Sequence, residues 1–321
     1  RAPAITELFL PVASSFQFVT NDPCDSRFIA TGPNPTVRAA NCAAFLSYYG
    51  LTSFTSTAHS ASIQGTNGGN PDLDNEVADS HTYGFTWAPS FFEGFTFAAD
   101  YYKIEIDQVI ASLTAANLAS ACFDSTDFNT SDIPNANSYC SKITRNAPGS
   151  SGPGQATTFA SGFVNGRYLN MEAYSAEARY SWDTAGMGRF TLSWVGYFPT
   201  ELTTDVTGVS PDPSAGEIGT SKKQHQFNIN WEGEKLGLNL SANYLSDAAF
   251  NLLNTNETQD IWRVGDYMLL NAGANYTFSE NLKLRLAVTN LLDVDPPFPT
   301  AGIGNYDILG RRYNLSFQWT F

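Results

Sequence analysis

The chain has 321 residues, of which 14% are aromatic and only 15% are charged, and its net charge is -14. This acidic excess argues against a nucleic-acid partner, because binding to a phosphate backbone depends on Lys and Arg. No stretch of about 18 apolar residues occurs, so the sequence contains no candidate transmembrane helix. Few charges and many aromatic residues are instead typical of strands that face lipid.

Four cysteines form two pairs with the same spacing, Cys24 with Cys42 and Cys122 with Cys140. Both pairs lie in sequence rich in Asn, Asp, Ser and Pro, and no CxxC motif or neighbouring His completes a zinc site. We therefore expect two local disulfides and maturation in an oxidising compartment such as a periplasm. Each disulfide should stabilise its loop by about 3 kcal/mol.

Apolar and polar residues alternate in nine segments, which predicts nine strands that each have one apolar and one polar face. Charged residues fall on the polar face of these strands. The nine segments are 83–87, 95–106, 174–182, 190–198, 226–231, 236–244, 268–278, 282–289 and 313–321.

The connections between these segments alternate between short and long. Short turns are expected near 88–94, 183–188, 232–235 and 279–281, and long loops near 108–167, 199–221, 246–262 and 291–307. Outer-membrane barrels have short periplasmic turns, long extracellular loops and aromatic girdles, and aromatic residues flank the short turns here. The predicted fold is therefore all-β, a transmembrane antiparallel β-barrel. The alternative is a soluble β-sandwich, whose apolar face would be a core and whose turns need not alternate in length.

Four stretches resemble the C-terminal half of TonB-dependent receptors. They are RAPAITELF at 1–9, NPDLDNEVADSHTYGFTWAP at 70–89, VTNLLDVDPPFP at 288–299 and YDILGRRYNLSFQWTF at 306–321. Asp74 and Asn75 depart from the Lys or Arg and the Pro that are more usual in the second stretch. The resemblance implies that the terminal strand is the signal read by the barrel-assembly machinery, through Tyr313, Phe317, Trp319 and Phe321.

Members of that family are plugged barrels, for which 22 strands are typical, and a single-chain bacterial barrel closes with an even number of strands. Residues 1–321 are accordingly expected to be the C-terminal portion of the barrel domain, its last nine strands, with the plug domain and the earlier strands absent from this chain. The resemblance implies insertion into the lipid of a Gram-negative outer membrane.

The function implied by the resemblance is active uptake of a scarce ligand, such as a ferric siderophore, cobalamin or an oligosaccharide, with the inner-membrane TonB complex pulling on the plug. Two other functions remain open at this point. A passive porin would share the girdles and the loop asymmetry, and a surface adhesin or barrel-borne enzyme could use the long loop near 108–167.

No catalytic, cofactor or metal site is expected from the sequence. The three histidines, His59, His81 and His225, lack metal-ligand spacing, and no nucleophile elbow or phosphate-binding loop occurs. Residues 108–122 carry apolar side chains near helical spacing, which predicts a short helix that packs the longest loop.

Two sets of residues are candidates for contact with a ligand. Aromatic residues assigned to the long loops could bind rings or sugars, although they also pack loops; they are Tyr48, Tyr49, Tyr139, Phe163, Tyr197, Trp262 and Tyr306. Charged residues expected to face the lumen could tune selectivity, or simply face water or the plug; they are Glu177, Arg179, Arg189, Lys283 and Arg285.

Overall fold

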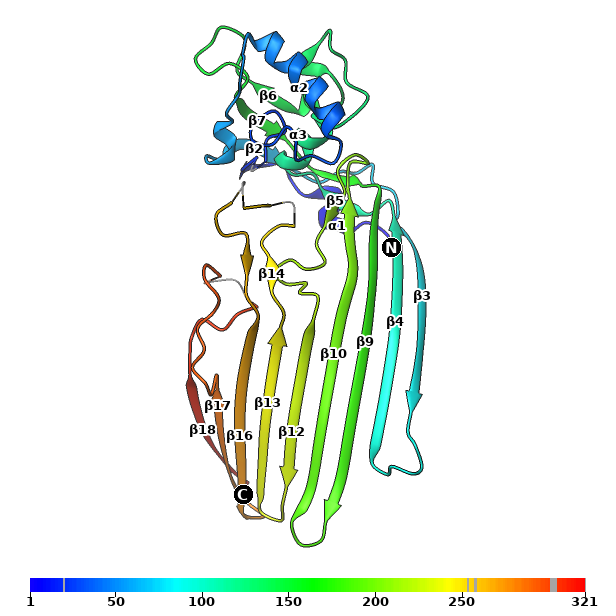
Figure 1. Ribbon diagram of the computed structural model, residues 1–321, viewed down its shortest axis with the longest axis vertical. Helices are drawn as coiled ribbons and strands as arrows, with labels where there is room; N and C mark the ends of the chain where they lie inside the picture. Colours follow the sequence, from blue (N-terminus) through cyan, green and yellow to red (C-terminus); the bar gives the residue numbers. More distant parts are fainter. Residues whose placement is uncertain (20, 253, 257–258, 301–304, 321) are drawn as a thin grey trace. The chain divides into compact units, whose positions relative to one another are not determined.

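Figure 1 shows a computed structural model, which describes residues 1–19, 21–252, 254–256, 259–300 and 305–320. The chain divides into two compact units, and each is described by itself. Unit 1 comprises Arg1–Asp79, Glu105–Asn170 and Thr203–Pro213, and unit 2 comprises Ser80–Ile104, Met171–Leu202 and Ser214–Phe321. No helix in the described part of the chain is long and apolar enough to span a membrane.

All nine expected strands are present in the described part of the chain, and they are hydrogen-bonded in chain order. Figure 1 shows the neighbouring strands side by side along the sheet. The strands are β3 (Val77–Trp87), β4 (Phe95–Asp107), β9 (Tyr168–Thr184), β10 (Gly188–Asp205), β12 (Gln224–Glu232), β13 (Leu236–Leu245), β16 (Tyr267–Ser279), β17 (Leu282–Thr289) and β18 (Arg312–Trp319), and the two-residue β11 (Asp212–Pro213) also pairs with β10.

The four predicted short turns are confirmed, because only a few residues separate β3 from β4, β9 from β10, β12 from β13 and β16 from β17. At the second of these turns Gly188 has a φ of 91°. A Cβ atom at Gly188 would lie 2.0 Å from the carbonyl oxygen of Glu232 on the neighbouring strand. Both the positive φ and the close approach of the two strands therefore require glycine at this turn.

The register of the sheet places apolar residues opposite apolar residues from strand to strand. Leu240, for example, lies opposite Ile229 on β12 and Ala272 on β16, and Leu286 on β17 lies opposite Leu315 on β18. Because side chains alternate between the two faces of a strand, this register produces one continuous apolar face and one polar face. The predicted separation of the two faces is thus confirmed.

The polar face is lined mainly by amide and hydroxyl side chains. On β12, Asn228 lies opposite Ser193 and Ser241, and Asn230 lies opposite Asn239. The side-chain amide of Asn239 donates a hydrogen bond of 2.7 Å to the Oδ1 atom of Asn230. This face is therefore suited to water, whereas the opposite face is suited to lipid.

Unit 1 has a fold of its own, which the sequence did not indicate. Its main sheet has the order β1 (Ala13–Gln17), β2 (Ile63–Asn67), β7 (Ala156–Ala160) and β6 (Ile143–Arg145), and β2 and β7 are parallel. Further elements are α1 (Ile5–Phe9), α2 (Pro35–Tyr49), η1 (Thr57–His59), β5 (Ile110–Ser112), α3 (Ala115–Phe123), η2 (Ile133–Asn135), η3 (Cys140–Lys142) and β8 (Phe163–Asn165). The long connection predicted near 108–167 is confirmed between β4 and β9. It is not irregular, however, because it contains strands and helices of its own and folds together with the first 79 residues.

Local signals explain where the two longer helices of unit 1 begin and end. Helix α2 has Pro35 in its first turn and ends at Gly50, which has the left-handed φ of 68°; both are common at these positions because proline lacks an N–H and glycine lacks a Cβ. In α3, the Thr114 side chain accepts a hydrogen bond from Asn117 N, and Asn117 Oδ1 accepts one from Thr114 N. This reciprocal cap confirms a short helix within the predicted segment, beginning after β5.

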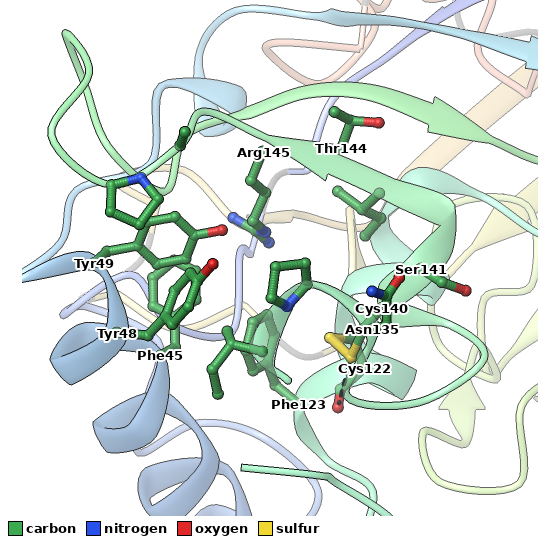
Figure 2. A pocket seen from close by; sticks show the side chains of 15 residues that line it. Phe45, Tyr48, Tyr49, Cys122, Phe123, Asn135, Cys140, Ser141, Thr144 and Arg145 are labelled. Carbon is green, nitrogen blue, oxygen red and sulfur yellow. Dashed lines mark hydrogen bonds between the residues drawn. A yellow bond between two sulfur atoms is a disulfide. The ribbon is translucent and has the colours of Figure 1, made fainter. Parts of the chain in front are cut away.

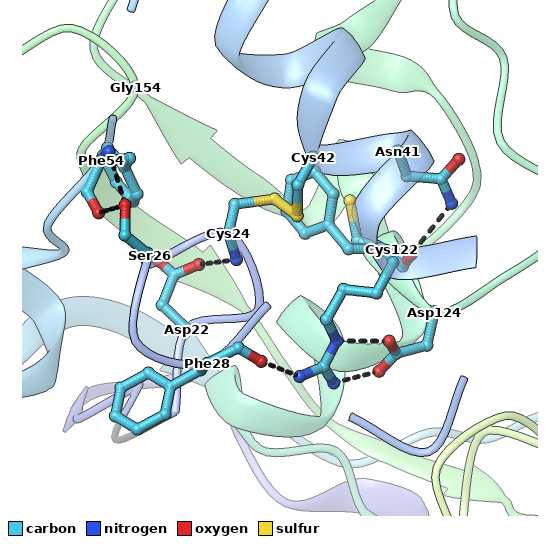
Figure 3. The surroundings of a disulfide bond; sticks show 12 residues. Asp22, Cys24, Ser26, Phe28, Asn41, Cys42, Phe54, Cys122, Asp124 and Gly154 are labelled. Atoms are coloured by element: carbon cyan, nitrogen blue, oxygen red, sulfur yellow. Dashed lines mark hydrogen bonds and ion pairs between the residues drawn. A yellow bond between two sulfur atoms is a disulfide. The ribbon is translucent and has the colours of Figure 1, made fainter. Parts of the chain in front are cut away.

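Both predicted disulfides are confirmed, Cys24–Cys42 as the first and Cys122–Cys140 as the second. The first joins the turn before α2 to that helix, and the second joins α3 to η3. Figure 3 shows the first disulfide close to Asn41, whose side chain donates to the carbonyl oxygen of Phe123 at 2.9 Å. The four cysteines are buried in an apolar cluster with Phe45, Phe54, Phe123 and Ile133.

A buried ion pair also connects α2 to the end of α3. Arg38 Nε lies 2.6 Å from Asp124 Oδ1, and Arg38 Nη2 lies 2.5 Å from Asp124 Oδ2. Only 4% of the Arg38 side chain and none of the Asp124 side chain is exposed. Arg38 Nη1 also donates to the carbonyl oxygen of Phe28 at 3.0 Å. The charges are therefore paired where solvent cannot reach them.

Candidate functional site

The structure brings two of the seven predicted ligand-contact residues together in one cavity of unit 1. Tyr48 and Tyr49 lie in the last turn of α2, with ring centroids 4.9 Å apart in an edge-on arrangement. The Tyr48 side chain is exposed, whereas that of Tyr49 is buried. The sequence had suggested that both tyrosines lie in a loop, but they lie on a helix.

The cavity that these tyrosines line has a volume of about 270 Å³. Figure 2 shows its lining side chains, which come from α2, the end of α3, η2, η3, β6 and the segment after β6. Most of the wall is apolar or aromatic, including Phe45, Phe123, Ile133 and Pro134. The polar groups in the wall are the side chains of Tyr48, Tyr49, Asn135, Ser141, Thr144 and Arg145.

Among the described residues that line this cavity, Arg145 alone is charged. It was not one of the candidates predicted from the sequence. Only 8% of its side chain is exposed. Its Nη1 atom donates to the carbonyl oxygen of Gly154 at 2.9 Å and lies 3.5 Å from Asp22 Oδ2. Its Cζ atom lies 5.2 Å from the ring centroid of Phe45 and 5.4 Å from that of Phe123, so the guanidinium is held by two cation–π contacts.

The surroundings of Tyr49 affect the acidity of its hydroxyl. Burial raises the pKa of Tyr49 above its ordinary value, and the positive charge of Arg145 opposes this effect. Tyr49 therefore remains a neutral hydrogen-bond donor near neutral pH. In Figure 2 the hydroxyls of Tyr48 and Tyr49 both point toward Arg145, so donors converge on the same part of the cavity.

Tyr139 and Phe163 also belong to unit 1, but the structure uses them differently. Tyr139 packs against both apolar clusters of the unit, and its hydroxyl donates to the carbonyl oxygen of Thr207 at 3.3 Å. Burial, followed by the charge of Asp205, raises the pKa of Tyr139. Phe163 lies in β8 and pairs with Ser112 of β5. Neither residue lines the cavity described above.

The other three aromatic candidates lie in unit 2 and are not gathered into one site. Tyr197 was expected in a loop, but it lies within β10 opposite Gln224, so its assignment to a loop was wrong. Trp262 donates through Nε1 to Asn256 Oδ1 at 2.6 Å. Tyr306 is buried in a small cluster, with its ring centroid 5.3 Å from that of Tyr267, and burial raises the pKa of Tyr306.

The five predicted lumen charges lie on β9, β10 and β17, in phase with the polar face. Arg189 lies opposite Glu232, and its guanidinium forms an exposed ion pair with Asp183 at 3.0 Å. Lys283 lies opposite Gln318, and Arg285 lies opposite Ser316. Glu177 and Arg179 are exposed positions of β9. Their contact with a ligand stays a prediction.

The proposed assembly signal lies on β18, the last strand in the sheet order. Tyr313, Phe317 and Trp319 are exposed by 70%, 68% and 68%, respectively. They share one face of the strand with Leu315, which continues the apolar face of the sheet. Phe321 lies outside the described residues, and the role of this strand in assembly stays a prediction.

One sequence signal could have identified Arg145. In β6, Ile143 and Arg145 are two positions apart, so a strand directs both side chains to the same face. Ile143 is buried in the core of unit 1, which places the arginine on an inward-facing position. The segment was assigned to a loop, and the period of two was therefore not applied to it. No cluster of His, Cys, Asp or Glu in the described part of the chain could hold a metal ion.

The sequence matches the family described as TonB dependent receptor-like, beta-barrel over residues 1–291. The chain therefore belongs to the family of TonB-dependent receptor β-barrels. Membership implies a location in the outer membrane of a Gram-negative bacterium. No curated protein was found to match the sequence.

Solved structures with a similar fold include the siderophore receptor PirA from Acinetobacter baumannii, with a TM-score of 0.53 and 12% identity over 81% of this chain and 34% of that chain. A mutant of the ferric enterobactin receptor PfeA from Pseudomonas aeruginosa, in complex with enterobactin, has a TM-score of 0.51 and 13% identity over 80% of this chain and 33% of that chain. This chain thus spans about a third of the length of these receptors. At such identities the similarity shows the fold alone.

Proposed function

We propose that this chain is part of an outer-membrane receptor that takes up a scarce ligand with energy delivered by the TonB complex. The match to the TonB-dependent receptor barrel family over residues 1–291 carries this proposal. In it, residues 1–321 are the C-terminal portion of the barrel domain, and a plug and further strands come from outside these residues. The match covers only about a third of each similar receptor, which supports that division.

A ferric siderophore is the first ligand class to test, with cobalamin and oligosaccharides as the others. The two similar structures with the higher TM-scores are described as a siderophore receptor and a ferric enterobactin receptor, which supports this order. In this proposal the charges Glu177, Arg179, Arg189, Lys283 and Arg285 line the path of the ligand. Their positions in phase with the polar face of the sheet support that role.

The test is uptake by a Gram-negative host that lacks its own siderophore receptors and carries the full-length receptor. Radiolabelled ferric siderophores, cobalamin and oligosaccharides are supplied singly, in cells with and without a functional TonB complex. We expect one ligand class to accumulate only when both the receptor and TonB are present. Equal accumulation with and without TonB would contradict active uptake.

The same protein distinguishes a receptor from a passive porin. In a planar bilayer, an open porin gives steady ion conductance, whereas a barrel filled by a plug should conduct very little. We expect the purified full-length receptor to be nearly silent until denaturant loosens the plug. Steady conductance of the untreated protein would favour the porin instead.

A further inference from the structure

The cavity of unit 1 has the features of a binding site, and no role in uptake is needed to explain it. Its volume of about 270 Å³ lies just below the range of roughly 300–1,000 Å³ for ligand pockets. It therefore suits a small molecule or one ring of a larger one. Tyr48, which is 44% exposed, borders it, so part of the wall faces solvent.

The buried guanidinium of Arg145 has an unused hydrogen-bond donor. Nη2 is shielded from solvent and has no hydrogen-bond partner among the residues that the structure describes, whereas Nη1 bonds to the carbonyl oxygen of Gly154. A buried donor without a partner costs free energy that an incoming acceptor recovers. An anionic oxygen is the strongest such acceptor for a guanidinium.

The protein itself neutralises this arginine only in part. The nearest carboxylate, Asp22, lies 3.5 Å from Nη1, and that oxygen also accepts a hydrogen bond of 2.9 Å from Ser56 Oγ. No acidic residue occurs among the described residues that line the cavity. In a chain with a net charge of -14, a cavity with a positive and no negative side chain selects for anions.

The rest of the wall indicates what should carry the negative charge. Phe45 and Phe123 both lie against the guanidinium, and Ile133 and Pro134 add apolar surface. A planar aromatic ring gains from contact with such walls. The two tyrosine hydroxyls point toward the guanidinium, so they can donate to the same anionic group.

From these observations we propose that the cavity of unit 1 binds an aromatic carboxylate, with the carboxylate on Arg145 and the ring against the apolar wall. The carboxylate accepts hydrogen bonds from Arg145 Nη2 and from the hydroxyls of Tyr48 and Tyr49. This site is a property of unit 1 and does not depend on whether the receptor transports the same molecule.

Benzoate is the probe, and its binding to the full-length receptor in detergent is measured by isothermal titration calorimetry. We expect saturable binding with one site per chain. Benzyl alcohol, which has the ring without the charge, should bind at least about tenfold more weakly. Equal binding of the two compounds would overturn the proposal, because the cavity would then recognise the ring alone.

Three variants locate the site. Arg145→Gln should weaken benzoate binding by about 10- to 100-fold, which is the usual effect of losing a hydrogen bond to a charged group. Arg27→Gln is the matched control, because Arg27 also lies over a phenylalanine ring but is paired with Asp25. Ala147→Trp places a large side chain at an exposed position of the cavity wall and should also weaken benzoate binding.

The Ala147→Trp variant keeps the test decisive if Arg145→Gln fails to fold. Wild-type affinity in a folded Arg145→Gln or Ala147→Trp variant would overturn the proposal. Uptake assays report separately on transport. Loss of benzoate binding without loss of TonB-dependent uptake would confirm that the two properties are independent.

Discussion

The buried ion pair between Arg38 and Asp124 offers the sharpest test of what stabilises unit 1. Arg38→Met retains most of the volume of the side chain but leaves the Asp124 carboxylate buried. Among the described residues, Arg38 is the one side-chain donor to that carboxylate. Removing one partner of a buried pair typically costs about 3–5 kcal/mol. The carbonyl oxygen of Phe28 keeps its hydrogen bonds from Thr31, so the cost arises mainly from the isolated charge.

The first disulfide provides the readout, because Cys24 and Cys42 are both fully buried. A reductant and a thiol label can reach them only when unit 1 opens. A cost of about 3–5 kcal/mol should therefore accelerate labelling by roughly 100- to 5,000-fold, as followed by mass spectrometry of the intact receptor. Arg27→Met should accelerate labelling much less, because Asp25 keeps the hydrogen bond from Ser56 N.

A double variant separates loss of charge pairing from loss of packing. Arg38→Met combined with Asp124→Leu replaces the pair with apolar side chains, and such replacements are often neutral or stabilising. We expect its labelling rate to return most of the way to that of the wild type. Labelling of Arg38→Met at the wild-type rate, or of the double variant as fast as the single one, would refute the reasoning.

Three further predictions concern the sheet, the second disulfide and pH. Leu240→Arg on the apolar face should destabilise the barrel by about 2–4 kcal/mol in lipid vesicles, whereas Ser241→Arg on the polar face should cost far less, as measured by denaturant unfolding. Replacing both cysteines of the second disulfide with serine should lower the stability of unit 1 by about 3 kcal/mol, measured by thermolysin cleavage. The hydrogen bond from Arg1 lowers the pKa of Glu7 from 4.5 to about 2, so its stabilising effect is present above pH 4.5 and is lost as the pH falls toward 2. Pepsin cleavage in α1 should therefore rise as the pH falls from 4.5 to about 2. In the Glu7→Gln variant, α1 should be cleaved at every pH as readily as in the wild type at low pH.

The sheet could be predicted from the sequence because lipid and water impose a period of two on every strand. Where a strand extends beyond its alternating segment, this signal is missing and the prediction failed. β9 begins at Tyr168, before the alternation at 174–182, and β10 continues to Asp205, well beyond 198. Tyr197 was assigned to a loop although it falls inside the predicted strand 190–198, and it pairs with Gln224 of β12.

Unit 1 could not be predicted in the same way, because the contacts that define it are distant in sequence. β2 pairs with β7 through residues such as Gly65 and Phe159, and Arg38 binds Asp124. Periodicity describes a single segment and contains no information about which distant segment will be its partner. The two disulfides were predictable because each joins cysteines only 18 positions apart.

The two units therefore place different demands on their side chains. In the sheet, a slip of one residue would exchange the lipid-facing and water-facing sides of a whole strand, so each position depends on its neighbours. In unit 1, the disulfides and the buried ion pair stabilise the core. Tyr48 and Ala147 belong to neither and are exposed residues of the cavity wall. Exposed positions usually tolerate substitution within about 0.5 kcal/mol. Substitutions at Tyr48 and Ala147 should therefore change what the cavity binds without destabilising unit 1. These two positions are the ones at which to redesign the specificity of the cavity.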